Sequence, residues 1–275
     1  RQMCIRDSSI TTQESAFAQL RNLDQTAEIY TAIQDADDEF WKAHMLPEAL
    51  PSLQALNLYN ISQPVGIFIS AWEKWSRADF LSLLRIVENI SLRYNVICQH
   101  GASEQEGIYN QVARAIYDGK SLAEVLPDLR RVYPNDDEFK HAFATSCFKT
   151  RNTSKKARYL LARIERHLSP GNVLDESLLS LEHILPEHPN EQWCNDFGDE
   201  GIEDWAERLG NMTLMTGSAN KNIDQQPFPT KKALLAASPY KISQKASEYE
   251  EWNKAAIESL SLIHISEPTR PRLTS

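Results

Sequence analysis

The sequence predicts a mainly α-helical protein that ends in a small unit of two strands and a helix. Apolar residues recur at the helical spacing through most of the first 168 residues. After Ser169-Pro170-Gly171-Asn172, two short apolar stretches at 180–185 and 209–215 precede a short helical stretch at 231–237. With 275 residues, 41% apolar and 24% charged, the chain has the composition of a globular protein of one or two domains.

Helical segments fill the first part of the chain. The strongest pattern spans 76–97, where Ser76 is placed to cap the helix. Ser121 and Glu124 have the spacing of a capping box, at the start of a short helix that Pro127 limits. The apolar run at 65–72 fits a strand or a buried helix, and helix is favoured because its apolar face continues into the next segment. Further helices are expected over 9–35, 108–117, 135–145 and 153–168.

The C-terminal third has shorter apolar stretches, which are separated by prolines and acidic residues. Pro186 and Pro189 end the first strand candidate, and an acidic excursion at 190–204 separates it from the second. The following helix stops at Ser238-Pro239, and residues 243–260 are expected to form a last helix. The order strand, excursion, strand, loop, helix is that of a ββα unit, over which the last helix can pack.

Composition excludes several classes of protein. Cys4, Cys98, Cys147 and Cys194 form no C-x-x-C pair, which argues against a structural zinc site and a disulfide framework. No apolar run approaches the roughly 18 residues of a membrane helix, and no signal peptide precedes the first helix. The sequence has no glycine-rich phosphate loop, so we expect no nucleotide site in it. A reduced, cytoplasmic protein with no membrane partner is the expectation.

The charge is unevenly distributed. A formal net charge of -9 argues against a protein that coats nucleic acid. Residues 149–166, however, carry seven basic side chains and one glutamate, a local charge of +6. Lys155, Lys156 and Arg158 lie in this stretch as candidate DNA phosphate contacts, and a solvated helix face is an equal alternative.

The two ends differ from the rest of the sequence. Residues 1–7 and 261–275 do not continue the helical patterns beside them, and the second resembles translated adapter DNA from assembled environmental fragments. We therefore expect foreign ends on a fragment of a longer protein. The expected domains are a helical domain at 8–170 and a second domain at 171–260.

An acid next to a histidine, followed by two asparagines, forms the candidate site. Glu182 and His183 belong to the first strand candidate, and Asn211 and Asn220 follow at a spacing of nine. Hydrolysis of a phosphodiester requires a base, for which a histidine of near-neutral pKa is suited. It also requires positive charge, which Mg²⁺ supplies when one or two protein oxygens hold it. Glu182 and Asn220 can provide those oxygens, and His183 can provide the base.

The motifs around these residues resemble those of a known family. They are Leu181-Glu182-His183-Ile184-Leu185-Pro186, Leu209-Gly210-Asn211-Met212-Thr213-Leu214, the following Asn220, and Phe228-Pro229-Thr230-Lys231. Together they resemble the HNH (ββα-metal) nuclease pattern, and more narrowly the C-terminal nuclease domain of GmrSD-type modification-dependent restriction endonucleases.

The resemblance implies a role for each residue. His183 is the general base, Glu182 and Asn220 are ligands of Mg²⁺ or Mn²⁺, and Asn211 orients the loop or the histidine. Lys231 and Lys232 contact phosphates. One departure is that the family's last helix carries an arginine a few residues past the Trp-x-x-x-x-Ile spacing, where this sequence has Glu258-Ser259-Leu260.

The function implied is that of a metal-dependent endonuclease. It would cleave double-stranded DNA, modified DNA included, as part of a type IV restriction system in defence against phage and other foreign DNA. The family's N-terminal nucleotide-hydrolysing half, with its Asp-Gly-x-Gln-Arg motif, is absent from this sequence and would be its partner.

Each residue also has a structural alternative. A lone histidine followed by a proline is more typical of a turn or core position, and only the spacing to the two asparagines favours a site for His183. Asn211 after Gly210 is also typical of a turn, and Lys231 and Lys232 of a helix start. Adjacent strand residues face opposite ways, so Glu182 and His183 converge only if the strand ends or distorts there.

Two other functions remain open. A non-catalytic helical interaction module with a degenerate nuclease fold is the first. A phosphatase or another hydrolase is less favoured, because no cysteine or serine nucleophile has a recognisable setting.

Overall fold

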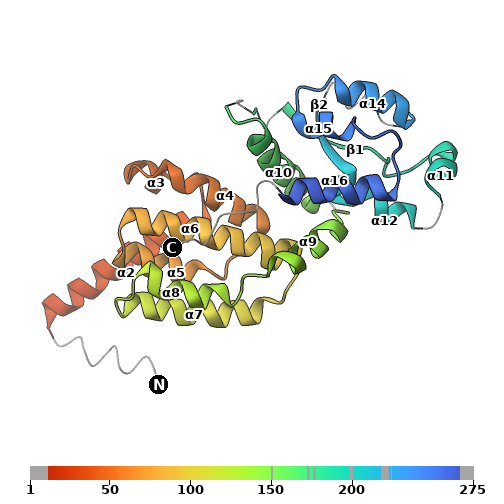
Figure 1. Cartoon of the computed structure of the whole chain (residues 1–275). Coiled ribbons are helices and arrows are strands. Elements are labelled where there is room, and N and C mark those ends of the chain that lie inside the picture. The colour runs from red at the N-terminus through yellow and green to blue at the C-terminus, as the bar shows by residue number, and fades with distance from the viewer. Residues whose placement is uncertain are drawn as a thin grey trace. The chain divides into compact units, whose positions relative to one another are not determined.

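The computed structural model describes residues 12–149, 151–171, 174–175, 178–198, 201–217, 223 and 225–266, shown in Figure 1. The chain forms two compact units that divide between Tyr133 and Pro134. The sequence prediction placed the domain limit later, after residue 170. The division is earlier because helices α9 (Asp136–Thr145) and α10 (Arg151–Leu168) pack on elements of the C-terminal unit. None of the helices described is both long and apolar enough to span a membrane.

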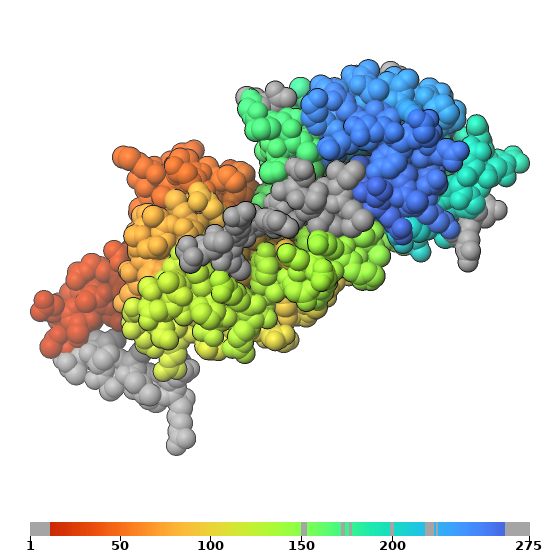
Figure 2. All heavy atoms as spheres, viewed as in Figure 1, coloured from red at the N-terminus to blue at the C-terminus, as the bar shows by residue number. Residues whose placement is uncertain are grey.

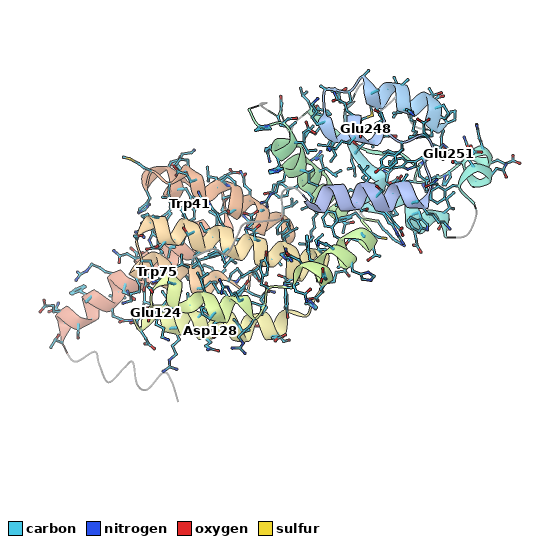
Figure 3. The ribbon with its side chains drawn as sticks, in the orientation of Figure 1. Trp41, Trp75, Glu124, Asp128, Glu248 and Glu251 are labelled. Carbon is cyan, nitrogen blue, oxygen red and sulfur yellow. The ribbon has the colours of Figure 1, made fainter. Side chains whose placement is uncertain are left out.

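Unit 1 is built from helices. They are α2 (Gln13–Gln34), α3 (Glu39–Ala43), the 3-10 helix η1 (Pro47–Ala49), α4 (Leu50–Tyr59), α5 (Val65–Lys74), α6 (Arg77–Ser91), the π-helical η2 (Leu92–Ile97), α7 (Ala102–Tyr117) and α8 (Leu122–Arg130). Large buried side chains fill the centre, among them Trp41, Phe68 and Phe80. Trp41, labelled in Figure 3, also donates its indole N–H to the Ala32 carbonyl at 2.9 Å.

Local sequence signals account for several elements of unit 1. The run at 65–72 is helical, as favoured, within α5. Ser76 caps α6 by accepting from the Asp79 N–H at 3.1 Å, and Ser121 and Glu124 form the capping box of α8. Pro127 does not end that helix, because the buried Val125 and Leu129 hold α8 against the core up to Arg130.

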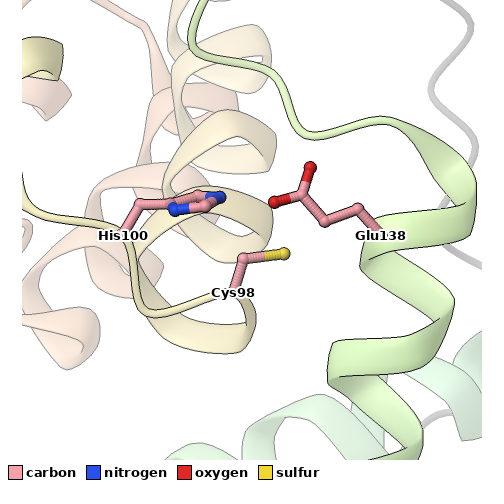
Figure 4. A group of neighbouring side chains, drawn as sticks. All are labelled: Cys98, His100 and Glu138. Carbon is pink, nitrogen blue, oxygen red and sulfur yellow. The ribbon is translucent and has the colours of Figure 1, made fainter.

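Unit 1 has exposed apolar side chains near the start of α2, and a cysteine and a histidine directly after η2. The N-terminal turns of α2, red in Figure 2, expose apolar side chains: Phe17, Leu20 and Leu23 are 51%, 60% and 49% exposed. Cys98 and His100 follow the end of η2, as Figure 4 shows. Glu138, also drawn there, belongs to α9 of the other unit.

Unit 2 combines helices with two strands. Besides α9 and α10 it has β1 (Leu179–His183), α11 (Glu191–Phe197), α12 (Ile202–Ala206), the 3-10 helix η4 (Leu209–Asn211), β2 (Met212–Thr216), α14 (Phe228–Ala236), α15 (Lys241–Ala246) and α16 (Lys254–Ser266). The strands pair antiparallel, with Glu182 opposite Thr213 and His183 opposite Met212. Helix α10 packs on both strands, and α15 packs on β2.

The prediction of a mainly α protein is confirmed, since the described residues contain a single two-stranded sheet. The expected last helix is wrong in detail, because residues 243–260 divide between α15 and α16. The break lets Trp252 turn into the core, where its indole N–H donates to the Asn211 side chain at 2.8 Å.

Ser261, the first residue of the expected foreign tail, is part of the folded core. Ser261 is fully buried in α16, next to Gly210. A Cβ atom added to Gly210 would overlap the Ile257 carbonyl oxygen and the Ser261 hydroxyl, so only glycine allows α16 to approach this closely. Residues 267–275 lie outside the described residues.

Candidate active site

Strand β1 ends at His183, and the chain then turns through Ile184, Leu185 and Pro186. The Ile184 N–H donates to the Asn211 carbonyl at 2.9 Å, which is the last backbone contact between the two chain segments before they separate. Ile184 and Leu185 are fully buried in the core of unit 2. The position of the His183 backbone is therefore fixed from both sides, by the sheet before it and by the buried turn after it.

Asn211 holds that turn in place. Its Oδ1 accepts from the Leu185 N–H and from the Trp252 indole, and its Nδ2 donates to the Leu185 and Ala206 carbonyls, each at 2.8 Å. Asn211 is fully buried, and these four bonds use its amide completely. The geometry suits the loop-orienting role expected for Asn211, and its amide does not reach a reacting group. Its role in catalysis stays a prediction.

Glu182 and Lys231 form a buried ion pair. The Lys231 Nζ lies 2.7 Å from Glu182 Oε1 and also donates to the His183 carbonyl at 2.9 Å. Lys231 is 0% exposed and Glu182 5% exposed. The pair thus ties the first turn of α14 to the end of β1. Lys231 was expected to contact a phosphate, and in this arrangement its ammonium group is instead enclosed by protein oxygens.

His183 faces two other carboxylates. Its Nε2 lies 3.6 Å from Glu187 Oε1 and 4.0 Å from Glu207 Oε2, and we call His183, Glu187 and Glu207 the His183 triad. At these separations neither contact is a hydrogen bond. Within the described residues, His183 Nε2 and Glu207 Oε2 are both buried and have no hydrogen-bond partner. Such orphaned polar atoms are costly and mark a place where a further group can bind.

Burial also sets the charges in the triad. It lowers the pKa of His183, with Glu187 opposing and Lys231 adding to the shift, so the imidazole is neutral at pH 7. Burial and the nearby Glu187 raise the pKa of Glu207. A neutral imidazole can accept a proton or bind a cation.

A cavity of about 360 Å³ adjoins these groups. Its wall includes Glu182, His183, Glu187, His188 and Ser154 of α10. Glu182 and His183 are adjacent in the sequence, and neighbouring strand residues normally face opposite ways. Both nevertheless line this cavity, because β1 ends at His183 and the chain turns directly after it. Their side chains still have different partners, Lys231 for Glu182 and the two glutamates for His183.

The basic stretch lies beside the cavity, on α10. Lys155 and Arg158 are exposed, while burial lowers the pKa of Lys156. The Arg158 guanidinium also donates to the Leu179 carbonyl at 3.5 Å. Further along α10, Glu165 is buried and accepts from the Lys241 and Ile242 N–H groups at 3.0 and 2.9 Å, which anchors the helix to α15.

The other expected residues are placed as follows. Lys232 follows Lys231 on α14 and lies 3.6 Å from the exposed Glu250. Asn220 lies outside the described residues, so its role as a metal ligand stays a prediction. Glu187 and Glu207 were not expected. Glu187 lies only four residues after His183, so its proximity in the sequence was a weak indication that the two side chains meet. Glu207 is 24 residues from His183, and no spacing rule connects it to the histidine.

A comparison with known domain families bears on this arrangement. The sequence model of the family described as "GmrSD restriction endonucleases, C-terminal domain" matches residues 133–261. No curated protein matches the chain. The matched stretch begins where unit 1 ends, and it includes β1, β2, α14 and every residue of the His183 triad.

Proposed function

Residues 133–261 belong to the family of C-terminal domains of GmrSD restriction endonucleases, and from this we propose that the chain is a metal-dependent DNA endonuclease. The membership makes unit 2 a restriction endonuclease-related domain. We further propose that strands β1 and β2 with α14 form an HNH-type ββα-metal unit, and that His183 is the general base of phosphodiester hydrolysis.

One observation supports the role of His183 more than any other. Its imidazole is kept neutral by burial, is held at the end of β1 by the sheet and by Asn211, and adjoins a cavity. A base must be unprotonated, fixed in place and within reach of a water molecule. The cavity, about 360 Å³, is large enough for water and a phosphate group.

The wall of the cavity also suits a divalent cation. Glu182 and Glu187 bring carboxylates to it, and Gln225 brings a buried amide oxygen that has no hydrogen-bond partner among the described residues. Mg²⁺ and Mn²⁺ prefer such oxygen ligands. We propose Glu182 and Asn220 as the ligands of the catalytic ion, whose chemistry would be to neutralise charge on the phosphate oxygens.

The chain's own residues supply the remaining steps. His183 takes the proton of the attacking water. Asn211 keeps the turn after His183 rigid, and the ion pair of Lys231 with Glu182 fixes β1 against α14. A phosphate contact by Lys231 would require that pair to open. Lys232, whose partner Glu250 is exposed, and Lys155 and Arg158 on α10 are the proposed contacts to the DNA backbone.

We propose that the enzyme acts on double-stranded DNA, modified DNA included, in defence against phage and other foreign DNA. Its partner would be the N-terminal nucleotide-hydrolysing half of the same enzyme, and it would act in the cytoplasm, where such DNA enters the cell. The family membership supports these statements.

One observation favours the alternative of a non-catalytic interaction module. Glu182 and Lys231, both expected at the reacting centre, neutralise each other in a buried ion pair. A degenerate nuclease fold can keep such a pair after its chemistry is lost, because removing either partner alone leaves a buried charge uncompensated.

Plasmid cleavage by the purified chain separates the two functions. Supercoiled DNA should be nicked in Mg²⁺ or Mn²⁺, should stay intact in EDTA, and should be nicked again when the metal is restored. Lys155→Ala with Arg158→Ala should weaken DNA binding and lower its salt dependence, while Lys140→Ala, an exposed lysine of α9 paired with Asp137, should not. Intact plasmid under all metal conditions would favour the interaction module.

A further inference from the structure

The His183 triad has the composition of a transition-metal site. One imidazole nitrogen and two carboxylate oxygens all lie within 4.8 Å of one another. Imidazole together with carboxylate suits first-row ions such as Zn²⁺, whereas Mg²⁺ prefers oxygen ligands alone. Three protein ligands with one open position are a common arrangement around Zn²⁺. The donor set thus differs in kind from the oxygen ligands proposed for the catalytic ion.

The unsatisfied atoms of the triad support this. His183 Nε2 and Glu207 Oε2 are buried, 4.0 Å apart, and neither has a hydrogen-bond partner in the described residues. Two ligands of one cation, each at about 2.1 Å from it, lie roughly 3 to 4 Å apart. The 3.6 and 4.0 Å separations of His183 Nε2 from the two carboxylates fall in that range. A cation would satisfy both orphaned atoms at once.

The charges point the same way. The Glu187 and Glu207 carboxylates both face the His183 imidazole. Within the described residues, neither carboxylate forms an ion pair with a lysine or arginine, as Glu182 does with Lys231. A divalent cation would supply the positive charge that these two carboxylates lack.

We propose that His183, Glu187 and Glu207 bind one Zn²⁺ ion and that this ion inhibits the nuclease. The binding stands on the triad's geometry, and the inhibition rests on the proposed function. A neutral imidazole has a single lone pair, so His183 cannot hold Zn²⁺ and accept a proton at the same time. Zn²⁺ would therefore switch off the base, while Mg²⁺, bound by oxygens elsewhere in the cavity, would leave it active.

Binding is tested with Zn²⁺ alone on the full chain, labelled with ¹⁵N-histidine. The thiols of Cys98, Cys147 and Cys194, none of them in a disulfide, also attract Zn²⁺, so the readout must be specific to the imidazole. We expect the ring ¹⁵N resonances of His183, assigned from His183→Gln, to shift with saturation at one equivalent. Resonances of His183 that stay in place when Zn²⁺ is added would overturn the proposal.

Two variants and one control define the ligands. Glu207→Gln should weaken Zn²⁺ binding at His183 by at least about tenfold, the lower end of what loss of even an outer-sphere partner costs. Glu187→Gln repeats the test at a side chain that is half exposed and so carries little risk of misfolding. Glu251→Gln removes an exposed carboxylate outside the triad (Figure 3) and should bind as the unmodified chain does. Unchanged affinity in both triad variants would contradict the ligand set.

Cleavage in Mg²⁺ then tests the inhibition. Zn²⁺ should halve the rate of the unmodified chain at a concentration close to its binding constant at His183. Glu187→Gln, measured against its own zinc-free rate, should need at least about tenfold more. Zinc binding at the triad in a chain that never cleaves DNA would disprove the proposed function and leave the site. Cleavage in Mg²⁺ that Zn²⁺ does not inhibit would disprove the regulation and leave the nuclease.

Discussion

Glu182 and His183 are neighbours in the sequence, yet the polar groups around them differ in how they are satisfied. On one side are three scaffold residues, Glu182, Lys231 and Asn211, all buried and engaged in an ion pair or in hydrogen bonds. On the other is the His183 triad, where two buried atoms have no hydrogen-bond partner in the described residues. The scaffold residues fix the end of β1, whereas the triad has buried polar atoms to which a further group could bind.

This difference makes the two sets separable by mutation. Changes in the scaffold residues should cost stability first, because each leaves a buried polar group without its partner. Changes in the triad should cost activity and metal binding with little loss of stability.

Lys231→Met should have the largest effect on stability. It leaves Glu182 buried without its countercharge, and breaking such a pair costs about 3 to 5 kcal/mol of unfolding free energy. Urea denaturation measures the loss. Lys232→Met is the matched control, since its partner Glu250 is 95% exposed, and it should cost less than about 1 kcal/mol.

The double variant Glu182→Gln with Lys231→Met sharpens this prediction. It removes both charges and should recover most of the stability, as replacement of a whole buried pair often does. A Lys231→Met protein as stable as the Lys232→Met control would show that the pair does not hold β1 to α14.

Asn211→Ala should come next. It leaves the Leu185 N–H, the Leu185 and Ala206 carbonyls and the Trp252 indole without their partner in the core. Several such groups at about 1 to 3 kcal/mol each, partly relieved by rearrangement, predict a loss near the upper end of that range. Asn253→Ala, which removes one part-buried contact to the Ala256 N–H, is the control. Equal losses in the two variants would contradict the account.

Gly210→Ala should perturb the scaffold without removing any polar group. The new methyl group would meet the Ile257 carbonyl and Ser261 of α16, and overpacking of this kind costs about 1 to 3 kcal/mol. Gly107→Ala, where no atom lies within 4 Å of the added carbon, should stabilise α7 slightly. Thermal unfolding of the two variants compares them, and a neutral Gly210→Ala would mean that α16 does not pack as closely as described.

Glu207→Gln should have the smallest effect on stability. It removes the repulsion between the Glu187 and Glu207 carboxylates, so the melting temperature in chelating buffer should be equal to or slightly above that of the unmodified chain. A clear loss would place Glu207 with the scaffold residues and would remove the contrast between the two sets.

Local signals in the sequence predicted much of the fold. Ser76 and the Ser121–Glu124 capping box mark helix starts through contacts within a single turn, which is why the caps of α6 and α8 were predictable. The division between α15 and α16 was not, because it depends on Trp252 reaching Asn211, 41 residues away in the chain. Periodicity carries no information about such a contact.

For the candidate site too, local motifs were informative and contacts between distant parts of the sequence were not predictable. The motifs made His183 and Asn211 candidates, since their residue types are specific at that spacing, and the roles expected of them stay predictions. They did not reveal that Lys231 is buried, because a lysine at a helix start is normally solvated and its burial depends on partners that are distant in the sequence, among them Glu182. Glu207 was missed for a similar reason, as the antiparallel pairing of β1 with β2 brings it to His183.

The most direct test of the account is the cleavage rate of His183→Ala. In Mg²⁺, with protein whose melting temperature matches that of the unmodified chain, the rate should fall by at least about 100-fold, the contribution of a general base. His141→Ala, which removes an exposed histidine of α9 in the same unit, should cleave normally. Cleavage by His183→Ala at the rate of the unmodified chain would contradict the claim that the triad at the end of β1 is the reacting centre.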